Sequence, residues 1–137
     1  VTHAGTYGGN GLSMAAAKAV LDILTASPVL DNLAQRGERL KAGLDQILTE
    51  ANLPHQMTGH PNIQSFLITE NPVKEVRDFS HTDEEMYEKI LTHLYHLGVW
   101  AEGDSREPWF LCESHSNEII DETLNKFQEA VKRTLDK

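Results

Sequence analysis

A glycine-rich stretch near the start of the chain, followed at once by a small and apolar helix, constrains this sequence more than any other feature. Four glycines fall within seven residues and leave the backbone free to take positive φ and to approach a ligand: Gly5, Gly8, Gly9 and Gly11. Thr6 adds a hydroxyl donor, and unpaired N–H groups at the start of a helix favour an anion. The pattern indicates a phosphate site, with a plain surface connection as the alternative. It is not a nucleotide P-loop, because Leu12 and not lysine follows the last glycine.

The string of residues in this loop is more specific than its glycine content. It resembles a segment that class III aminotransferases carry shortly after their Schiff-base lysine, and reads His3-Ala4-Gly5-Thr6-Tyr7-x-x-Asn10. These enzymes have fold type I and use pyridoxal phosphate (PLP). The resemblance implies that Thr6, beside Gly5, binds the phosphate of the PLP held by the neighbouring subunit of a homodimer. This chain departs from the family at one position, because it has Asn10-Gly11 where the family usually has Asn-Pro.

Composition excludes several kinds of partner. The 137 residues carry a formal net charge of −9, which argues against nucleic acid or an anionic membrane surface. No apolar run approaches the roughly 20 residues of a membrane helix, and no signal peptide is recognisable. The single cysteine, Cys112, excludes an intramolecular disulfide and fits a cytoplasmic location. Because the chain begins at Val1, with the glycine motif almost at its terminus, we expect it to be a piece of a longer protein.

Periodicity and turn signals predict seven elements, in the order helix, helix, strand, helix, strand, strand, helix. The expected ranges are helices at 12–26, 28–52 and 83–97, strands at 63–69, 99–101 and 109–112, connections at 54–61 and 70–79, and a last helix after residue 116. Thr82 and Ser116 are the expected N-caps, and Gly98 is the expected left-handed stop. The helix at 12–26 is apolar nearly all round and is expected to need burial on most sides. The order indicates an α/β (α+β) fold in which helices cover a small, mainly antiparallel sheet.

The order of elements also resembles the C-terminal small domain of the class III aminotransferases. The resemblance is specific at residues 3–20 and 110–124 and loose between them, and it is closest to the glutamate-1-semialdehyde 2,1-aminomutase branch of the family. It implies that residues 1–27 are the tail of the large PLP-binding domain, with the phosphate loop and its helix. Residues 28–137 would then be the small domain of a fold type I PLP enzyme.

The chain alone is not expected to hold a complete active site. PLP chemistry needs a lysine that binds the cofactor covalently, and the resemblance implies that this lysine lies upstream of the Thr6 motif, so no catalytic residue is predicted within the chain. Glu107 resembles a glutamate near the active-site mouth of the aminomutases and is a substrate-side candidate. A plain surface charge is the alternative for Glu107.

Three further groups have simpler interpretations. His93 and His96 have helical spacing for a metal ion, yet no Asp, Glu or Cys completes a zinc pattern, so no metal site is predicted. Cys112 is expected to be a small core residue in a strand rather than a nucleophile. Trp100 and Trp109 are expected to be core or interface aromatics.

The leading hypothesis is the C-terminal fragment of a PLP-dependent aminomutase or aminotransferase that resembles glutamate-1-semialdehyde 2,1-aminomutase. Such a protein is expected to act as a homodimer on a small amino-acid-like substrate. The resemblance favours the mutase because 2-oxoglutarate transaminases clamp a carboxylate with an arginine in this region, and residues 109–115 contain none. Two alternatives stay open: a fragment of an ω-amino-acid:2-oxo-acid class III transaminase, and a non-catalytic anion-binding or dimerisation module.

Overall fold

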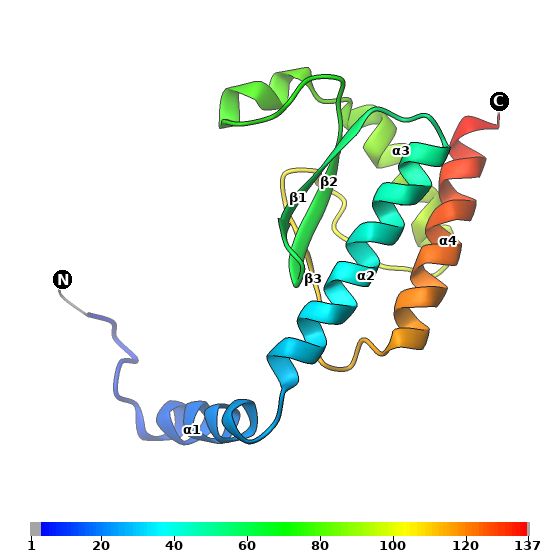
Figure 1. Cartoon of the computed structure of the whole chain (residues 1–137). Coiled ribbons are helices and arrows are strands. Elements are labelled where there is room, and N and C mark those ends of the chain that lie inside the picture. The colour runs from blue at the N-terminus through cyan, green and yellow to red at the C-terminus, as the bar shows by residue number, and fades with distance from the viewer. Residues whose placement is uncertain (1–3, 137) are drawn as a thin grey trace. The chain divides into compact units, whose positions relative to one another are not determined.

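The fold is given by a computed structural model that describes residues 4–136. Its elements in chain order are α1 Gly11–Ala26, α2 Val29–Glu50, β1 His55–His60, β2 Ile63–Ile68, the 3₁₀ helix η1 Val76–His81, α3 Glu84–His96, β3 Trp109–Phe110 and α4 Asn117–Leu135 (Figure 1). They form two compact units, one that ends at Asn32 and one that begins at Leu33. The assignment of residues 1–27 to a large domain stays a prediction.

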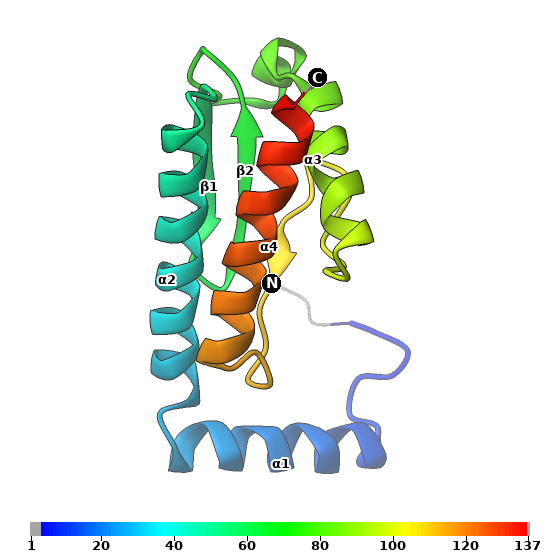
Figure 2. The same cartoon turned by 90° about the vertical axis from the view of Figure 1, so that its right-hand side faces the viewer.

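Three antiparallel strands form one sheet in the order β1-β2-β3. β1 pairs with β2 along its whole length, from His55 opposite Ile68 to His60 opposite Ile63, whereas β3 contributes only two residues. The helices α2 and α4 lie side by side across the sheet, and α3 lies next to α4 (Figure 2). The predicted α/β (α+β) arrangement, a small antiparallel sheet covered by helices, is confirmed.

The core lies between the sheet and the helices of the unit that begins at Leu33. Its largest members come from α2, β2, α3 and α4 and include Leu40, Leu44, Leu48, Phe66, Ile68, Ile90, Leu94, Phe127 and Val131. Phe66 is at its centre, with ring centroids 4.9 Å from Tyr87, 5.3 Å from Phe127 and 5.8 Å from Trp109. Steps of three and four residues bring the apolar side chains to one face of each helix, which is why periodicity predicted these helices.

A buried tyrosine ties α3 to the loop that follows it. The hydroxyl of Tyr87 donates to the carbonyl oxygen of Glu102 at 2.7 Å and accepts from Nε1 of Trp109 at 3.1 Å. Burial raises the pKa of Tyr87 to about 12, so this hydroxyl keeps its proton at neutral pH. The bonds fix the course of the loop across the end of the core.

Two predictions about strands are wrong. Residues 55–60, expected to be part of a connection, form β1, because pairing with β2 compensates for a sequence with one β-branched residue and a glycine. Residues 99–101, expected to be a strand, are irregular, because the Tyr95 hydroxyl donates to the Ala101 carbonyl oxygen at 2.7 Å and holds this segment against α3. The strand expected at 109–112 is confined to Trp109–Phe110.

Helix ends agree with the predicted caps in two of three places. Ser116 caps α4, and its hydroxyl accepts from a backbone N–H of the first turn. Gly98 follows α3 with a φ of 84°. The predicted N-cap Thr82 is wrong by one residue, because Asp83 caps α3 by accepting from the N–H of Met86 at 2.9 Å, while Thr82 ends η1.

The helix α1 has no buried residue. Its exposed apolar side chains are Leu12, Met14, Val20, Leu21 and Ile23. Within residues 4–136, no single helix is long and apolar enough to span a membrane, and α1 passes that test only together with α2, across the break at Ser27 and Pro28. The burial expected for α1 is therefore not supplied by the residues that the structure describes.

We expect the 137-residue chain to self-associate through α1, because exposed apolar area gains about 25 cal/mol for each Å² removed from water. Its sedimentation coefficient should rise with concentration. The double variant Leu21→Glu and Ile23→Glu should lower this dependence, whereas Val76→Glu, at an apolar residue of η1 that is 86% exposed, should leave it unchanged. A strict monomer at high concentration would contradict the prediction.

Candidate functional site

The glycine-rich loop forms a compact turn before α1. The N–H of Gly8 donates to the carbonyl oxygen of Gly5 at 3.0 Å, and the N–H of Asn10 donates to that of Tyr7 at 3.1 Å. Gly9 has a φ of 76°, which residues with a Cβ rarely adopt. The glycine content is therefore explained first by the shape of the turn.

Asn10 closes the start of α1. Its side-chain oxygen accepts hydrogen bonds from the backbone N–H groups of Leu12 at 3.1 Å and Ser13 at 3.2 Å. Its carbonyl oxygen accepts one from the backbone N–H of Met14 at 2.9 Å. These bonds occupy most of the first-turn donors, as an N-cap does. The expectation that the start of α1 offers its N–H groups to an anion is therefore wrong. An anion would have to bind to the loop before the helix instead.

Thr6 is a donor that this loop leaves available. It is exposed, and within residues 4–136 its hydroxyl has no hydrogen-bond partner. A Cβ on the neighbouring Gly5 would meet no atom within 4 Å, so the backbone beside Thr6 is open to a ligand. A free hydroxyl beside open backbone fits a phosphate oxygen. His3, the first residue of the motif, lies outside the described residues.

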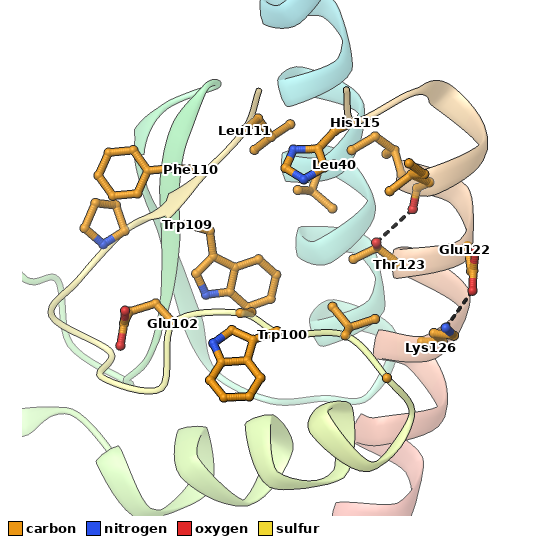
Figure 3. Close-up of a pocket in the computed structure, with 16 residues that line it drawn as sticks. Leu40, Trp100, Glu102, Trp109, Phe110, Leu111, His115, Glu122, Thr123 and Lys126 are labelled. Carbon is orange, nitrogen blue, oxygen red and sulfur yellow. Dashed lines mark hydrogen bonds and ion pairs between the residues drawn. The ribbon is translucent and has the colours of Figure 1, made fainter. Parts of the chain in front are cut away.

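A pocket of about 420 Å³ lies in the unit that begins at Leu33, between the loop after α3, β3 and α4 (Figure 3). Its lining is largely apolar and includes Leu40, Val99, Trp100, Trp109, Leu111 and Ile120. Three of its polar side chains are already engaged: Nδ1 of His115 accepts from a backbone N–H, and Lys126 pairs with Glu122 at 2.6 Å. The pocket was not predicted from the sequence, and Glu102 is its one lining carboxylate without an ion pair among residues 4–136.

Comparison with known proteins decides the family. A model of the class-III aminotransferases matches residues 1–131. The chain belongs to the class-III aminotransferase family. A glutamate-1-semialdehyde 2,1-aminomutase of Thermus thermophilus is 33% identical over 132 residues, which are 96% of this chain and 31% of that protein. The enzyme of the same name from Aquifex aeolicus is 30% identical over 132 residues, again 96% of this chain and 31% of that protein.

A solved structure gives the same fold. The FumI protein of Sphingopyxis sp. MTA144, solved in its PLP internal aldimine form, superposes with a TM-score of 0.79 at 22% identity, over 98% of this chain and 30% of that one. The likeness confirms the predicted fold. The chain spans about 31% of the length of these curated relatives.

Glu107 is the residue predicted for the substrate side of the site. It is exposed at the end of the loop before β3, and its backbone N–H donates to the carbonyl oxygen of Asp104 at 3.0 Å. It is not among the residues that line the pocket of Figure 3. Thr6 and Glu107 belong to different units of the chain, and a role for either in binding stays a prediction.

The arginine nearest to Glu107 is already paired. Nε of Arg106 donates to Oδ1 of Asp104 at 2.8 Å, and its Nη2 donates to Oδ2 at 2.6 Å. The guanidinium lowers the pKa of the Asp104 carboxyl to about 2, so this pair persists across the neutral range. No other arginine lies between residues 100 and 115.

The prediction that Cys112 is a small core residue is wrong. Cys112 is exposed, because β3 ends at Phe110 and the chain turns at once, with the N–H of His115 donating to the Cys112 carbonyl oxygen at 3.0 Å. In the part of the chain that the structure describes, no group of three His, Cys, Asp or Glu side chains is placed to hold a metal ion. Trp109 is buried as expected, whereas Trp100 is 94% exposed.

Proposed function

We propose that this chain is the C-terminal part of a PLP-dependent enzyme that moves an amino group, and that the enzyme is a cytoplasmic homodimer acting on a small amino-acid-like substrate. The observation that carries the proposal is the turn at residues 5–9 in a member of the class-III aminotransferase family, which leaves the Thr6 hydroxyl exposed and without a hydrogen-bond partner among residues 4–136. Another solved chain of the same fold, matched at a TM-score of 0.75, is described as a transaminase with PLP bound.

In this proposal Thr6 and Gly5 hold the cofactor phosphate of the neighbouring subunit. The hydroxyl of Thr6 donates to a phosphate oxygen, and the open backbone at Gly5 lets the phosphate approach. Asn10 supports them, because its bonds to α1 fix the end of the turn that presents Thr6. PLP, when bound, supplies the electron sink for breaking bonds at the carbon that carries the amino group.

For the substrate we favour a glutamate-1-semialdehyde 2,1-aminomutase reaction. The curated relatives named above carry that name, and the stretch from Trp109 to His115 contains no arginine that could clamp a second carboxylate. Arg106 is held by Asp104. An exchange within one substrate needs no site for a separate 2-oxo-acid acceptor.

An ω-amino-acid:2-oxo-acid transaminase is the second candidate. An omega-transaminase from Sphaerobacter thermophilus has the same fold, with a TM-score of 0.78 and 20% identity over 98% of this chain and 30% of that one. At this identity the likeness shows the fold and does not favour either reaction. A non-catalytic anion-binding or dimerisation module is not favoured, because the family match runs through both the loop and the small domain.

We expect the full-length enzyme to convert glutamate-1-semialdehyde without an added amine donor or acceptor. It should turn over more slowly with an amine donor and 2-oxoglutarate, since the region that would hold the acceptor carboxylate offers no unpaired arginine. Both reactions are measured on the same preparation at saturating PLP. Fast turnover in the second assay only would assign the transaminase reaction instead.

We expect that no single lysine of the 137-residue chain binds PLP covalently and in stoichiometric amount. No lysine in residues 4–136 is buried, and three of them form exposed or half-buried ion pairs with acids four residues away: Lys18, Lys89 and Lys126. After incubation with PLP, borohydride reduction and peptide mapping should show label spread over several lysines. One stoichiometric site would contradict the expectation that the Schiff-base lysine lies outside the chain.

A further inference from the structure

A second hollow of the unit that begins at Leu33 is a groove of about 510 Å³ between α3 and the loop at residues 100–106. One wall is formed by Glu84, Tyr87, Glu88 and Tyr95 of α3, and the other by the seven residues of the loop. The tyrosine hydroxyls that bind the carbonyl oxygens of residues 101 and 102 hold the two walls at a fixed separation. The groove is therefore a built feature rather than a gap beside a loose loop.

The charge of this groove is strongly one-sided. Its lining contains four carboxylates, Glu84, Glu88, Glu102 and Asp104, and one guanidinium, Arg106, which leaves a net charge of −3. Asp104 and Arg106 neutralise one another at 2.6 Å. Within residues 4–136, the other three carboxylates form no ion pair. An anion is repelled here, and a cation is attracted.

Aromatic rings lie beside these carboxylates. The ring centroids of Tyr95 and Trp100 are 5.6 Å apart, with their planes at 38°, and both residues line the groove. Trp100 is 94% exposed, so its faces are open to a ligand. The face of a tryptophan or tyrosine ring attracts an organic cation.

The loop wall also carries an unused acceptor. Ser105 is only 6% exposed, and its Oγ has no hydrogen-bond partner in the described chain. Buried hydroxyls without a partner are uncommon, because the lost bond to water is not replaced. Ser105 lines the groove, and a rotation of its side chain would bring the Oγ, which is closed to water, to the N–H groups of a ligand.

We propose that this groove binds an organic ammonium ion, the protonated end of an alkyl amine. Glu84, Glu88 and Glu102 provide the countercharge, Tyr95 and Trp100 provide the aromatic wall, and Ser105 accepts a hydrogen bond. A bare metal ion lacks a ligand set, because no three carboxylate, imidazole or thiol groups among the described residues come close enough to hold one. An ammonium ion on a carbon chain suits carboxylates spread along a groove with aromatic faces.

The test uses the 137-residue chain without cofactor, so its result is separate from that of the proposed enzyme reaction. Calorimetric titration with cadaverine, 1,5-diaminopentane, at low ionic strength should show binding that weakens as salt is added. Two ligands of similar length, 1,5-pentanediol and glutarate, should not bind. Equal binding of the diol would overturn the proposal, because the site would then recognise an apolar chain and not a charge.

Variants locate the site. Glu88→Gln and Glu102→Gln should each weaken cadaverine binding about fivefold, the effect of one charge at about 4 Å in water. Glu38→Gln, at an exposed carboxylate of α2 outside the groove, is the matched control and should leave binding unchanged. Equal effects of the three variants, or a dissociation constant above about 10 mM for the parent chain, would refute the site.

Two further variants test the aromatic wall and the hydroxyl. Trp109 is buried and Trp100 exposed, so cadaverine should change the tryptophan fluorescence, and Trp100→Phe should remove that change while weakening binding. Ser105→Ala should weaken binding without lowering the free energy of unfolding, because the hydroxyl has no partner to lose. Unchanged affinity in Ser105→Ala would remove this residue from the proposed site, and unchanged affinity in both variants would overturn the proposal.

Discussion

Gly37→Ala is expected to lower the free energy of unfolding by about 2–4 kcal/mol, although alanine favours a helix more than glycine does. Gly37 lies where α2 passes the turn between β1 and β2, and a methyl group there would overlap the carbonyl group of Pro61. Gln64 joins the same contact, because its Nε2 donates to the carbonyl oxygens of Gly37 at 2.9 Å and Pro61 at 2.8 Å. If the two backbones move apart, the packing is strained and the fully buried side-chain amide of Gln64 loses its hydrogen bonds.

Gly43→Ala is the matched control, because it changes the same residue type in the same helix. A methyl group at Gly43 would meet Cδ2 of Leu124 at 2.5 Å, the flexible end of a side chain that can move, so the loss should stay within about 1 kcal/mol. Urea unfolding followed by circular dichroism measures both variants. Equal stability of Gly37→Ala and the parent chain would show that α2 does not approach the turn this closely.

Thr6→Val in the full-length enzyme is expected to weaken PLP binding roughly ten- to a hundredfold, since a charge-assisted hydrogen bond contributes on the order of 1.5–3 kcal/mol. Valine keeps the shape of the side chain and removes only the hydroxyl. This hydroxyl has no partner in the described chain, so its loss should leave the stability of the protein nearly unchanged. Turnover at saturating PLP should also stay close to that of the parent enzyme, because Thr6 is proposed to hold the phosphate rather than the reacting atoms.

The measurement is the PLP concentration that restores half of the activity after the cofactor has been removed. Thr123→Val is the control, since it makes the same change on α4, where the hydroxyl donates to the carbonyl oxygen of Ile119 at 2.8 Å. The control should leave PLP affinity unchanged. If Thr6→Val has the affinity of the control, the loop does not meet the phosphate.

The helices and the central strand were predictable because their signals are local. Leucines at 33, 40, 44 and 48 recur with the helical period, and the β-formers of residues 63–68 lie between turn residues. The N-cap Ser116 and the stop at Gly98 act within one turn of the backbone. The loop motif at residues 3–10 was informative for the same reason, because its identity is carried by consecutive residues.

Predictions failed where contacts between segments, rather than the propensity of one segment, decide the structure. Residues 55–60 become a strand through β2, and residues 99–101 lose their expected strand to the Tyr95 hydroxyl. Cys112 is exposed because the chain turns immediately after β3. The groove beside α3 was not predicted, because its carboxylates are spread between residues 84 and 104 in the sequence. They line one hollow only because hydrogen bonds from tyrosine hydroxyls of α3 hold the loop against the helix.

Periodicity and short motifs were enough to predict the family, the mixed fold, the helices and the residue proposed to bind the phosphate. Tertiary structure alone decided the pairing of β1, the close approach of α2 to Pro61 and the charged groove along α3. These features arise when separate segments of the chain are brought together by burial of the core around Phe66. The propensity of a single segment carries no information about such contacts, because the contacts stabilise the fold only once the chain has brought the segments together.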